Sequence, residues 1–471
     1  MRDFTQGSIL RHLLVFSLPM IANNLIQAIY GVIDAFWVGR LVGHEALAAV
    51  STAMPVIFFT ASLLIGLGIA ATIMTGQAYG ARDNAMLSRI ISNSFLGSMG
   101  ITLGLTVAGI ISAPFIVRLI NAPPVVEHAA TVFLRISIAG FVFITITQWF
   151  AGLLSGLGDA KRPLIIQIAT IVLNIVLAPI FISGVGLWKP MGVAGSAWAT
   201  VISSGVGAFL VLLMYRRHAF LRMLPFSVKL DWQLLKRMFV LGVPMSLQMI
   251  VVSSSFLLIV ALVNVYGEYV TAAFGIGGRV DQFAFMTILA VCMAISSITA
   301  QNIGADRLER VQETARWGVF VSLCFGLFFF AVVNLTAHSL AGFFTAEPRV
   351  IEETVGYFRY VSFAYFGIAL LFAFQGIARG AGDMVSSLLI VATGMVFLRL
   401  PLCWALSEYT PLREKGLWLG MTLSASMGGL IFWGYYILGR WKKIGAMRYR
   451  SNMMPNKAEI KDLDGAETYP L

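Results

Sequence analysis

Residues 15–38, VFSLPMIANNLIQAIYGVIDAFWV, form an apolar segment that is long enough to cross a membrane and contains a carboxylate. Asn23, Gln27, Tyr30 and Asp34 interrupt this run, the last three at offsets of 4, 7 and 11 from the first. At about 100° per residue, these offsets place the four side chains on one face of a helix. The segment therefore predicts a membrane-spanning helix with a polar stripe.

Asp34 is the acid of this stripe. A carboxylate inside a membrane span is costly unless it faces protein or water, so its default interpretation is a substrate or ion pathway. Low-dielectric surroundings favour the neutral form of a carboxyl group, which allows it to take up and release a proton. The alternative is a structural acid, held by a static bond to a neighbouring helix.

Composition places the chain among membrane proteins. Hydrophobic residues make up 58% of its 471 residues and charged residues 12%, compared with about 25% charged residues in soluble domains. Twelve apolar segments of spanning length predict an all-α polytopic protein with twelve transmembrane helices. The first segment lacks a cleavage site, so we expect a retained span rather than a signal peptide.

Positive charge is distributed unevenly around these segments. With the N-terminal end inside, the inside segments hold 23 of the 33 Lys and Arg residues and the outside segments hold six. This bias predicts a multi-pass protein of a prokaryotic cytoplasmic (inner) membrane with both termini in the cytoplasm. It also explains the net charge of +11, so no nucleic-acid partner is expected.

The chain contains an internal repeat. Three stretches recur 224 residues later: 77–80 (QAYG) as 301–304 (QNIG), 133–135 (FLR) as 357–359 (YFR), and 156–159 (GLGD) as 380–383 (GAGD). Each copy holds six spans, so both copies enter the membrane from the same side. This arrangement predicts two lobes related by a pseudo-twofold axis along the membrane normal. We interpret the glycine-rich stretches as cytoplasmic turns.

The repeat divides the chain into four expected parts. These are an N-terminal six-helix lobe at 1–214, a cytoplasmic linker at 215–238, a C-terminal six-helix lobe at 239–439 and a cytoplasmic tail at 440–471.

Motifs for catalysis are absent from the sequence. It contains no Gly-x4-Gly-Lys-Ser/Thr loop, no Gly-x-Ser-x-Gly elbow and no His-Glu-x-x-His helix. The His and Cys residues show no metal-ligand or disulfide spacing. We therefore expect no enzyme activity and no cofactor, and a transporter driven by an ion gradient rather than by ATP.

The fifth and sixth spans carry further polar faces. Each has three polar side chains at helical spacing: Gln167, Thr170 and Asn174 in the fifth, and Ser196, Thr200 and Ser203 in the sixth. If these faces meet Asp34, Asn174 and Thr200 become candidates for ion coupling. The second copy has Ile259 in the place of Asp34, so coupling is predicted to lie in the first half.

These features resemble a known family. Residues 30–39 (YGVIDAFWVG), the QxxG and GxGD stretches and their repeats look like the multidrug and toxic compound extrusion (MATE) family, and the first-span acid resembles its DinF-like branch. The likeness covers the whole chain except its tail. It implies two six-helix lobes that form a V around a central cavity. It also implies export of amphipathic, often cationic, compounds in exchange for H+ or Na+.

The resemblance implies specific roles for residues of the first half. By this likeness Asp34 is the coupling acid, with Tyr30, Asn174 and Thr200 beside it. If Na+ is the coupling ion, Asp34, Asn174 and Thr200 are its expected ligands.

Two positions depart from the family pattern. Ala178 stands where many relatives have Asp, and Ala151 stands where many have Asn. A hard cation such as Na+ needs several oxygen ligands, whereas a proton needs one acid. We therefore favour H+ over Na+.

The expected substrate cavity draws on both halves. Its predicted lining residues are Asn23, Gln27, Tyr30, Trp37, Gln167, Asp281 and Arg399. Arg279 lies two residues before Asp281, and this spacing suggests an ion pair between them. The expected partners are small amphipathic drugs or toxins and the lipid bilayer, and a monomer is expected.

Two other functions are compatible with a polytopic membrane protein. A flippase or exporter of lipid-linked or anionic substrates requires a strongly basic cavity. A non-transporting membrane scaffold has no need of a buried acid. The net charge of the cavity distinguishes cation export from the flippase, because a negative cavity favours cations and a positive cavity favours lipid phosphates or other anions.

Overall fold

The computed structural model describes residues 1–184 and 189–443, without the side chains of residues 32, 35 and 44–47. Within these ranges all regular structure is helical. Eleven helices are long and apolar enough to cross a membrane, and α4 and α5, which meet at a 41° bend, form a twelfth span. The prediction of an all-α protein with twelve spans is confirmed.

The first half of the chain contains the first six spans. Its helices are α1 (Ile9–Leu41), α2 (His44–Gly80), α3 (Asn84–Leu119), α4 (Pro124–Ala139), α5 (Phe141–Gly156), α6 (Lys161–Ser183) and α7 (Val193–Arg217).

The second half repeats this order after a short helix, α8 (Ala219–Met223). Its elements are α9 (Trp232–Asn264), α10 (Glu268–Gly304), α11 (Leu308–Phe344), α12 (Pro348–Val361), α13 (Ala364–Ala381), α14 (Met384–Ala392), the π-helical turn η1 (Thr393–Phe397), α15 (Arg399–Glu408) and α16 (Glu414–Ile437).

Side-chain caps fix the start of several helices. The carboxylate of Asp83 accepts the Met86 N–H at 2.8 Å before α3, and that of Asp383 accepts the Ser386 N–H at 3.2 Å before α14. Such caps satisfy amide groups that a helix leaves unpaired at its N-terminus. Asp383 ends the GAGD stretch of the repeat, so this stretch sets where α14 begins.

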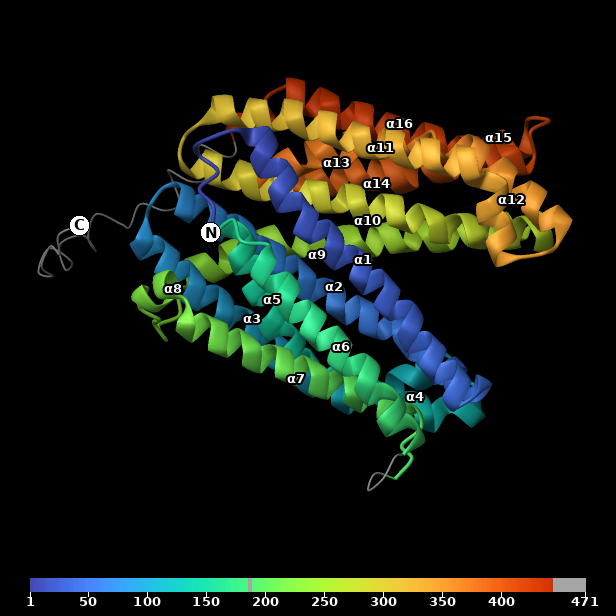
Figure 1. Cartoon of the computed structure of the whole chain (residues 1–471), viewed down its shortest axis with the longest axis horizontal. Coiled ribbons are helices and arrows are strands. Elements are labelled where there is room, and N and C mark those ends of the chain that lie inside the picture. Colours follow the sequence, from blue (N-terminus) through green and yellow to red (C-terminus); the bar gives the residue numbers. More distant parts are fainter. Residues whose placement is uncertain (185–188, 444–471) are drawn as a thin grey trace, which may run out of the picture.

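Two groups of helices meet at one end of the molecule and diverge toward the other (Figure 1). Helix α1 crosses between them, packing against α10 and α11 near its start and against α6 further on. In the same way α9 packs against α2 of the first half and α14 of the second. This is the V of two lobes that the resemblance implied.

The expected boundaries of the two lobes, the linker and the tail remain a prediction. The structure adds one detail about the linker and one about the tail. In the linker, expected at 215–238, the structure has α8 and the start of α9 at Trp232. Of the tail, expected at 440–471, residues 440–443 are helical and Trp441 is buried. The rest of the tail, residues 444–471, lies outside the described residues.

The end at which the two groups meet, here called the convergent end, is formed by the C-termini of α2 and α10. A Cβ atom added to Gly80 would lie 1.9 Å from the carbonyl oxygen of Gln301, and one added to Gly304 would lie 1.9 Å from that of Gln77. The two helix ends therefore touch through their backbones, and the repeat makes the contact reciprocal.

The glycine-rich stretches thus have two different roles. Gly158 and Gly382 lie in turns with φ of +77° and +83°, as predicted, because this backbone conformation favours glycine. Residues 77–80 and 301–304 are instead the last turns of α2 and α10, so their interpretation as turns was wrong. Their glycines serve close helix packing.

Candidate functional site

Asp34 lies on α1 opposite α7. One of its carboxylate oxygens accepts a hydrogen bond from Ser196 Oγ at 3.3 Å. Ser196 is 1% exposed, and Asp34 itself is half-buried. The acid therefore faces protein, as the cost of placing a carboxylate in lipid requires.

Thr200 is the centre of the polar contacts beside Asp34. Its hydroxyl donates to the carbonyl oxygen of Ser196 at 3.2 Å, which uses its only proton. Asn174 Nδ2, 3.1 Å away, and the Tyr30 hydroxyl, 3.5 Å away, must then donate to Thr200 Oγ1. The structure thus brings the four predicted ion-coupling residues together, with Ser196 as a fifth. We call these five residues the first-half polar cluster.

Ser196 was noted on the polar face of the sixth span but was not among the predicted site residues. The signal that would have found it is its position four residues before Thr200, on the same face of α7 as the residue chosen. The direct partner of Asp34 is this serine rather than Thr200.

The cluster offers few oxygen atoms to a metal ion. Among the described residues no group of three or more His, Cys, Asp or Glu side chains is placed to hold one. Ala178 is fully buried one helical turn after Asn174 and has no side-chain oxygen to contribute. Both lone pairs of Thr200 Oγ1 are already used by Asn174 and Tyr30. A Na+ site at Asp34, Asn174 and Thr200 would require these bonds to break.

A small cavity of about 50 Å³ lies beside the polar stripe of α1. It is lined by Asn23, Thr147, Gln148, Ala151, Pro163, Ile166 and Gln167. Two predicted lining residues, Asn23 and Gln167, therefore share a cavity, and the amide of Gln167 also reaches Gln27 Oε1 at 3.5 Å. The short side chain of Ala151 forms part of the wall.

Trp37, another predicted lining residue, packs against an apolar cluster of the first half and lies edge-on to Phe36, with ring centroids 5.5 Å apart. Its buried indole N–H has no hydrogen-bond acceptor among the described residues. An indole N–H normally finds a partner when buried. The structure thus places Trp37 against apolar side chains rather than in the small cavity.

Asp281 and Arg399 lie in the second half, apart from the first-half polar cluster. Asp281 accepts hydrogen bonds from the hydroxyls of Tyr357 and Tyr365, each at 2.5 Å. The predicted ion pair with Arg279 is wrong, because the guanidinium of Arg279 lies over the ring of Phe344, 5.9 Å from its centroid. The hydrogen-bond partners of Asp281 are therefore two tyrosines and not an arginine.

Tyr357 belongs to the 357–359 stretch of the repeat, and this was the only sequence signal for its role. Arg399 donates to Ser424 Oγ at 3.3 Å. No carboxylate forms an ion pair with Arg399 in the described part of the chain.

Tyr357→Phe is expected to lower thermal stability. The change removes one of two donors to Asp281, and a hydrogen bond to a charged group contributes about 1.5–3 kcal/mol. The apparent Tm of the purified protein in detergent should therefore fall. Tyr409→Phe is the matched control, because Tyr409 is 72% exposed and its loss should leave the Tm unchanged. Equal Tm values for both variants would show that the Tyr357–Asp281 bond contributes nothing to stability.

Comparison with known proteins identifies the family. The chain matches the MatE family over residues 19–180 and 244–405, once in each half. The chain belongs to the MatE family. Membership confirms the expectation of a membrane transporter of the MATE type rather than an enzyme, and the two matches coincide with the internal repeat. The assignment to a DinF-like branch stays a prediction.

Two relatives of this MatE protein come from Bacillus subtilis (strain 168). The probable multidrug resistance protein YoeA is 30% identical over 446 residues, which cover 93% of this chain and 96% of YoeA. The probable multidrug resistance protein YpnP is 31% identical over 443 residues, covering 93% and 97%. The crystal structure of a MATE protein in the straight conformation superimposes with a TM-score of 0.86 at 23% identity, covering 94% of this chain and 98% of that one.

Proposed function

We propose that this chain is a secondary active multidrug antiporter that exports amphipathic, cationic compounds in exchange for H+. The observation that carries the proposal is the environment of Asp34. It is a half-buried carboxylate on α1 whose hydrogen-bond donor is the neutral hydroxyl of Ser196. No cation forms an ion pair with it among the described residues. A proton and a cationic substrate can therefore compete for the same negative charge.

The relatives support the substrate class. YoeA and YpnP are both named probable multidrug resistance proteins and align over nearly their whole lengths. Within the protein, Tyr30 and Trp37 provide aromatic rings on the same helix as Asp34, and aromatic faces bind organic cations. A site of this kind accepts flat cationic drugs without requiring one fixed shape.

H+ is the proposed coupling ion because the first-half polar cluster contains a single carboxylate. Binding of Na+ would need further oxygen ligands, and Thr200 Oγ1 has none of its lone pairs free. Protonation of Asp34 needs no further oxygen ligands. We propose Tyr30, Asn174, Ser196 and Thr200 as residues that position Asp34.

We propose that the convergent end faces the cytoplasm. Arg82, Arg162, Arg307 and Arg310 lie at or near the helix ends that form it, and positive charge is selected on the cytoplasmic side of membrane proteins. The V then opens away from the cytoplasm. Export requires a second state in which the convergent end separates and admits the substrate.

Export of anionic or lipid-linked compounds is the second candidate. It is favoured by Arg399, a half-buried guanidinium whose hydrogen-bond partner is the hydroxyl of Ser424. A FAD transporter from Shewanella oneidensis is among the relatives, 24% identical over 434 residues.

The test is transport of a fluorescent dye into proteoliposomes that contain the purified protein. A cationic dye and an anionic dye are compared under a pH gradient alone and under a Na+ gradient alone. We expect the pH gradient to drive uptake of the cationic dye, with no effect of Na+. Uptake driven only by Na+ would contradict H+ coupling, and preference for the anionic dye would favour the second candidate.

A further inference from the structure

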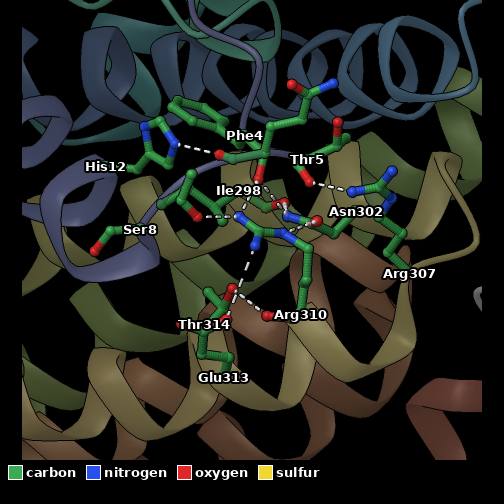
Figure 2. Close-up of polar contacts among 12 residues, drawn as sticks. Phe4, Thr5, Ser8, His12, Ile298, Asn302, Arg307, Arg310, Glu313 and Thr314 are labelled. Carbon is green, nitrogen blue, oxygen red and sulfur yellow. Dashed lines mark hydrogen bonds and ion pairs between the residues drawn. The ribbon is translucent and has the colours of Figure 1, made fainter.

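The segment before α1 crosses the convergent end and touches both halves of the molecule. We call residues 2–8 the N-terminal strap. Figure 2 shows this segment lying across the start of α11, with several arginine and amide side chains directed at its backbone. Backbone groups of an extended segment must find hydrogen-bond partners when they are buried. The strap finds them on α10 and α11, at Arg307 between these two helices, and at the turn that follows α5.

The second half holds the strap through four side chains. The Phe4 N–H donates to Gln301 Oε1 at 2.9 Å, and Asn302 Nδ2 donates to the Phe4 carbonyl at 3.3 Å. Arg307 Nη1 donates to the Thr5 carbonyl at 2.6 Å. Arg310 Nη2 donates to the carbonyls of Phe4 and Gly7 at 3.0 and 2.9 Å. Guanidinium donors form stronger hydrogen bonds than neutral groups do.

The ring of Phe4 anchors the strap from the apolar side. It is 0% exposed and belongs to the hydrophobic core of the second half, together with Ile298. It lies edge-on to Phe16 and His12, with ring centroids 5.1 and 5.3 Å away. Because Phe16 and His12 are on α1, the strap also fixes the start of that helix.

The first half binds the strap near the N-terminal end of the strap. The Arg2 N–H donates to the Leu157 carbonyl at 3.3 Å, and Asp3 forms an ion pair with Arg82 at 3.8 Å. At Gly158 an added Cβ would lie 2.4 Å from the Arg2 carbonyl oxygen. The GLGD turn of the repeat is thus shaped to receive the strap.

The duplicated glutamines bridge the halves directly beneath the strap. Gln301 Nε2 donates to the Gly156 carbonyl at 2.8 Å, and Gln77 Nε2 donates to the Gly380 carbonyl at 3.1 Å. Gln301 also reaches the Arg2 carbonyl at 3.4 Å. The strap therefore joins a reciprocal set of bonds that spans the two halves.

We propose that the N-terminal strap is a latch that holds the convergent end closed. It is attached to both halves, so the halves cannot separate at this end until one set of its contacts breaks. The proposal rests on the proposed export function only in taking the convergent end as the side of substrate entry. Release of the strap is then a step of the transport cycle.

The test measures the separation of the two halves without substrate or ion gradient. Nitroxide labels are attached to Lys161→Cys in the first half and Glu309→Cys in the second, both at exposed positions, in a background in which Cys292, Cys324 and Cys403 are replaced. The distance distribution is recorded by pulsed electron paramagnetic resonance for the parent, for the double variant Arg307→Gln with Arg310→Gln, and for Arg316→Gln. The last is the matched control, an exposed arginine of α11 that makes no hydrogen bond to the strap.

We expect the double variant to raise the ratio of separated to closed molecules by about tenfold or more, the effect of losing one hydrogen bond to a charged group. The control should match the parent. Phe4→Ala removes the buried ring that anchors the strap and should cause the same shift. This second variant keeps the test decisive if the double variant does not fold. A parent-like distance distribution in the folded variants would overturn the proposal. Because Asp34 takes no part, this outcome is independent of the coupling mechanism.

Discussion

Asp34→Asn is expected to reduce gradient-driven dye export by about 100-fold or more, equivalent to roughly 2.7 kcal/mol on the transport barrier. The amide keeps the size of the side chain and can still accept the Ser196 bond. It cannot exchange a proton or carry the charge that attracts a cation. The measurement is dye uptake into proteoliposomes under a pH gradient, normalised to the amount of folded protein.

Ser196→Ala is the informative companion to this variant. It removes the donor to Asp34 but leaves the acid, so we expect a reduction of several-fold rather than a complete loss, with a shifted pH dependence of transport. Leu18→Ala is the control, because Leu18 is an exposed residue of the same helix that lies outside the polar stripe, and it should leave export unchanged. Normal export by Asp34→Asn would mean that the acid is structural, as the alternative interpretation of the sequence had it.

Gly80→Ala is expected to destabilise the convergent end. The new Cβ would lie 1.9 Å from the Gln301 carbonyl oxygen, so the α2 and α10 helix ends must move apart. Overpacking of this kind typically costs about 1–3 kcal/mol, and here the obstacle is backbone, which adapts poorly. We expect a lower apparent Tm and a loss of export at 37 °C. Gly304→Ala should have the same effect, because the contact is reciprocal.

Gly104→Ala provides the matched control. Gly104 is also a helical glycine, but an added Cβ meets no atom within 4 Å. This change should be neutral or stabilise the helix by about 0.5–1 kcal/mol, as alanine does relative to glycine. If Gly80→Ala behaves like Gly104→Ala, close backbone contact at the convergent end is not needed.

The sequence predicted the fold well because the membrane restricts the possibilities. Apolar length fixed the number of spans, and the 224-residue repeat indicated two equivalent halves. The bend at Gly140 between α4 and α5 was not foreseen, since the residues around it are continuously apolar. The crossing of α1 to the second half was also missed, because hydrophobicity shows that a segment spans but not which neighbour it contacts.

The first-half polar cluster was predicted more completely than the second-half residues. Helical spacing placed Tyr30 and Asp34 on one face, and the same rule applied to Asn174 and Thr200. For Asp281 the nearest arginine in sequence suggested a partner, but Arg279 lies about 200° around the helix from it. Tyr357 and Tyr365 come from helices far along the chain, and spacing alone gives no information about such contacts.

The N-terminal strap shows the same limit of local patterns. Residues 77–80 and 301–304 stood out as repeated glycine and glutamine positions, yet their purpose became clear only once α2 and α10 were seen end to end. Gln301 contacts both Arg2 and Gly156. One side chain thus joins three segments that lie far apart in the sequence.

The central claim is that Asp34 exchanges a proton for a cationic substrate, and the most direct measurement is proton release on substrate binding. Purified protein in weakly buffered detergent solution, at a pH where Asp34 is protonated, is mixed with a saturating cationic dye while a pH indicator is followed. We expect the parent to release protons in proportion to the dye bound and Asp34→Asn to release none. Equal proton release by the two proteins would contradict this claim.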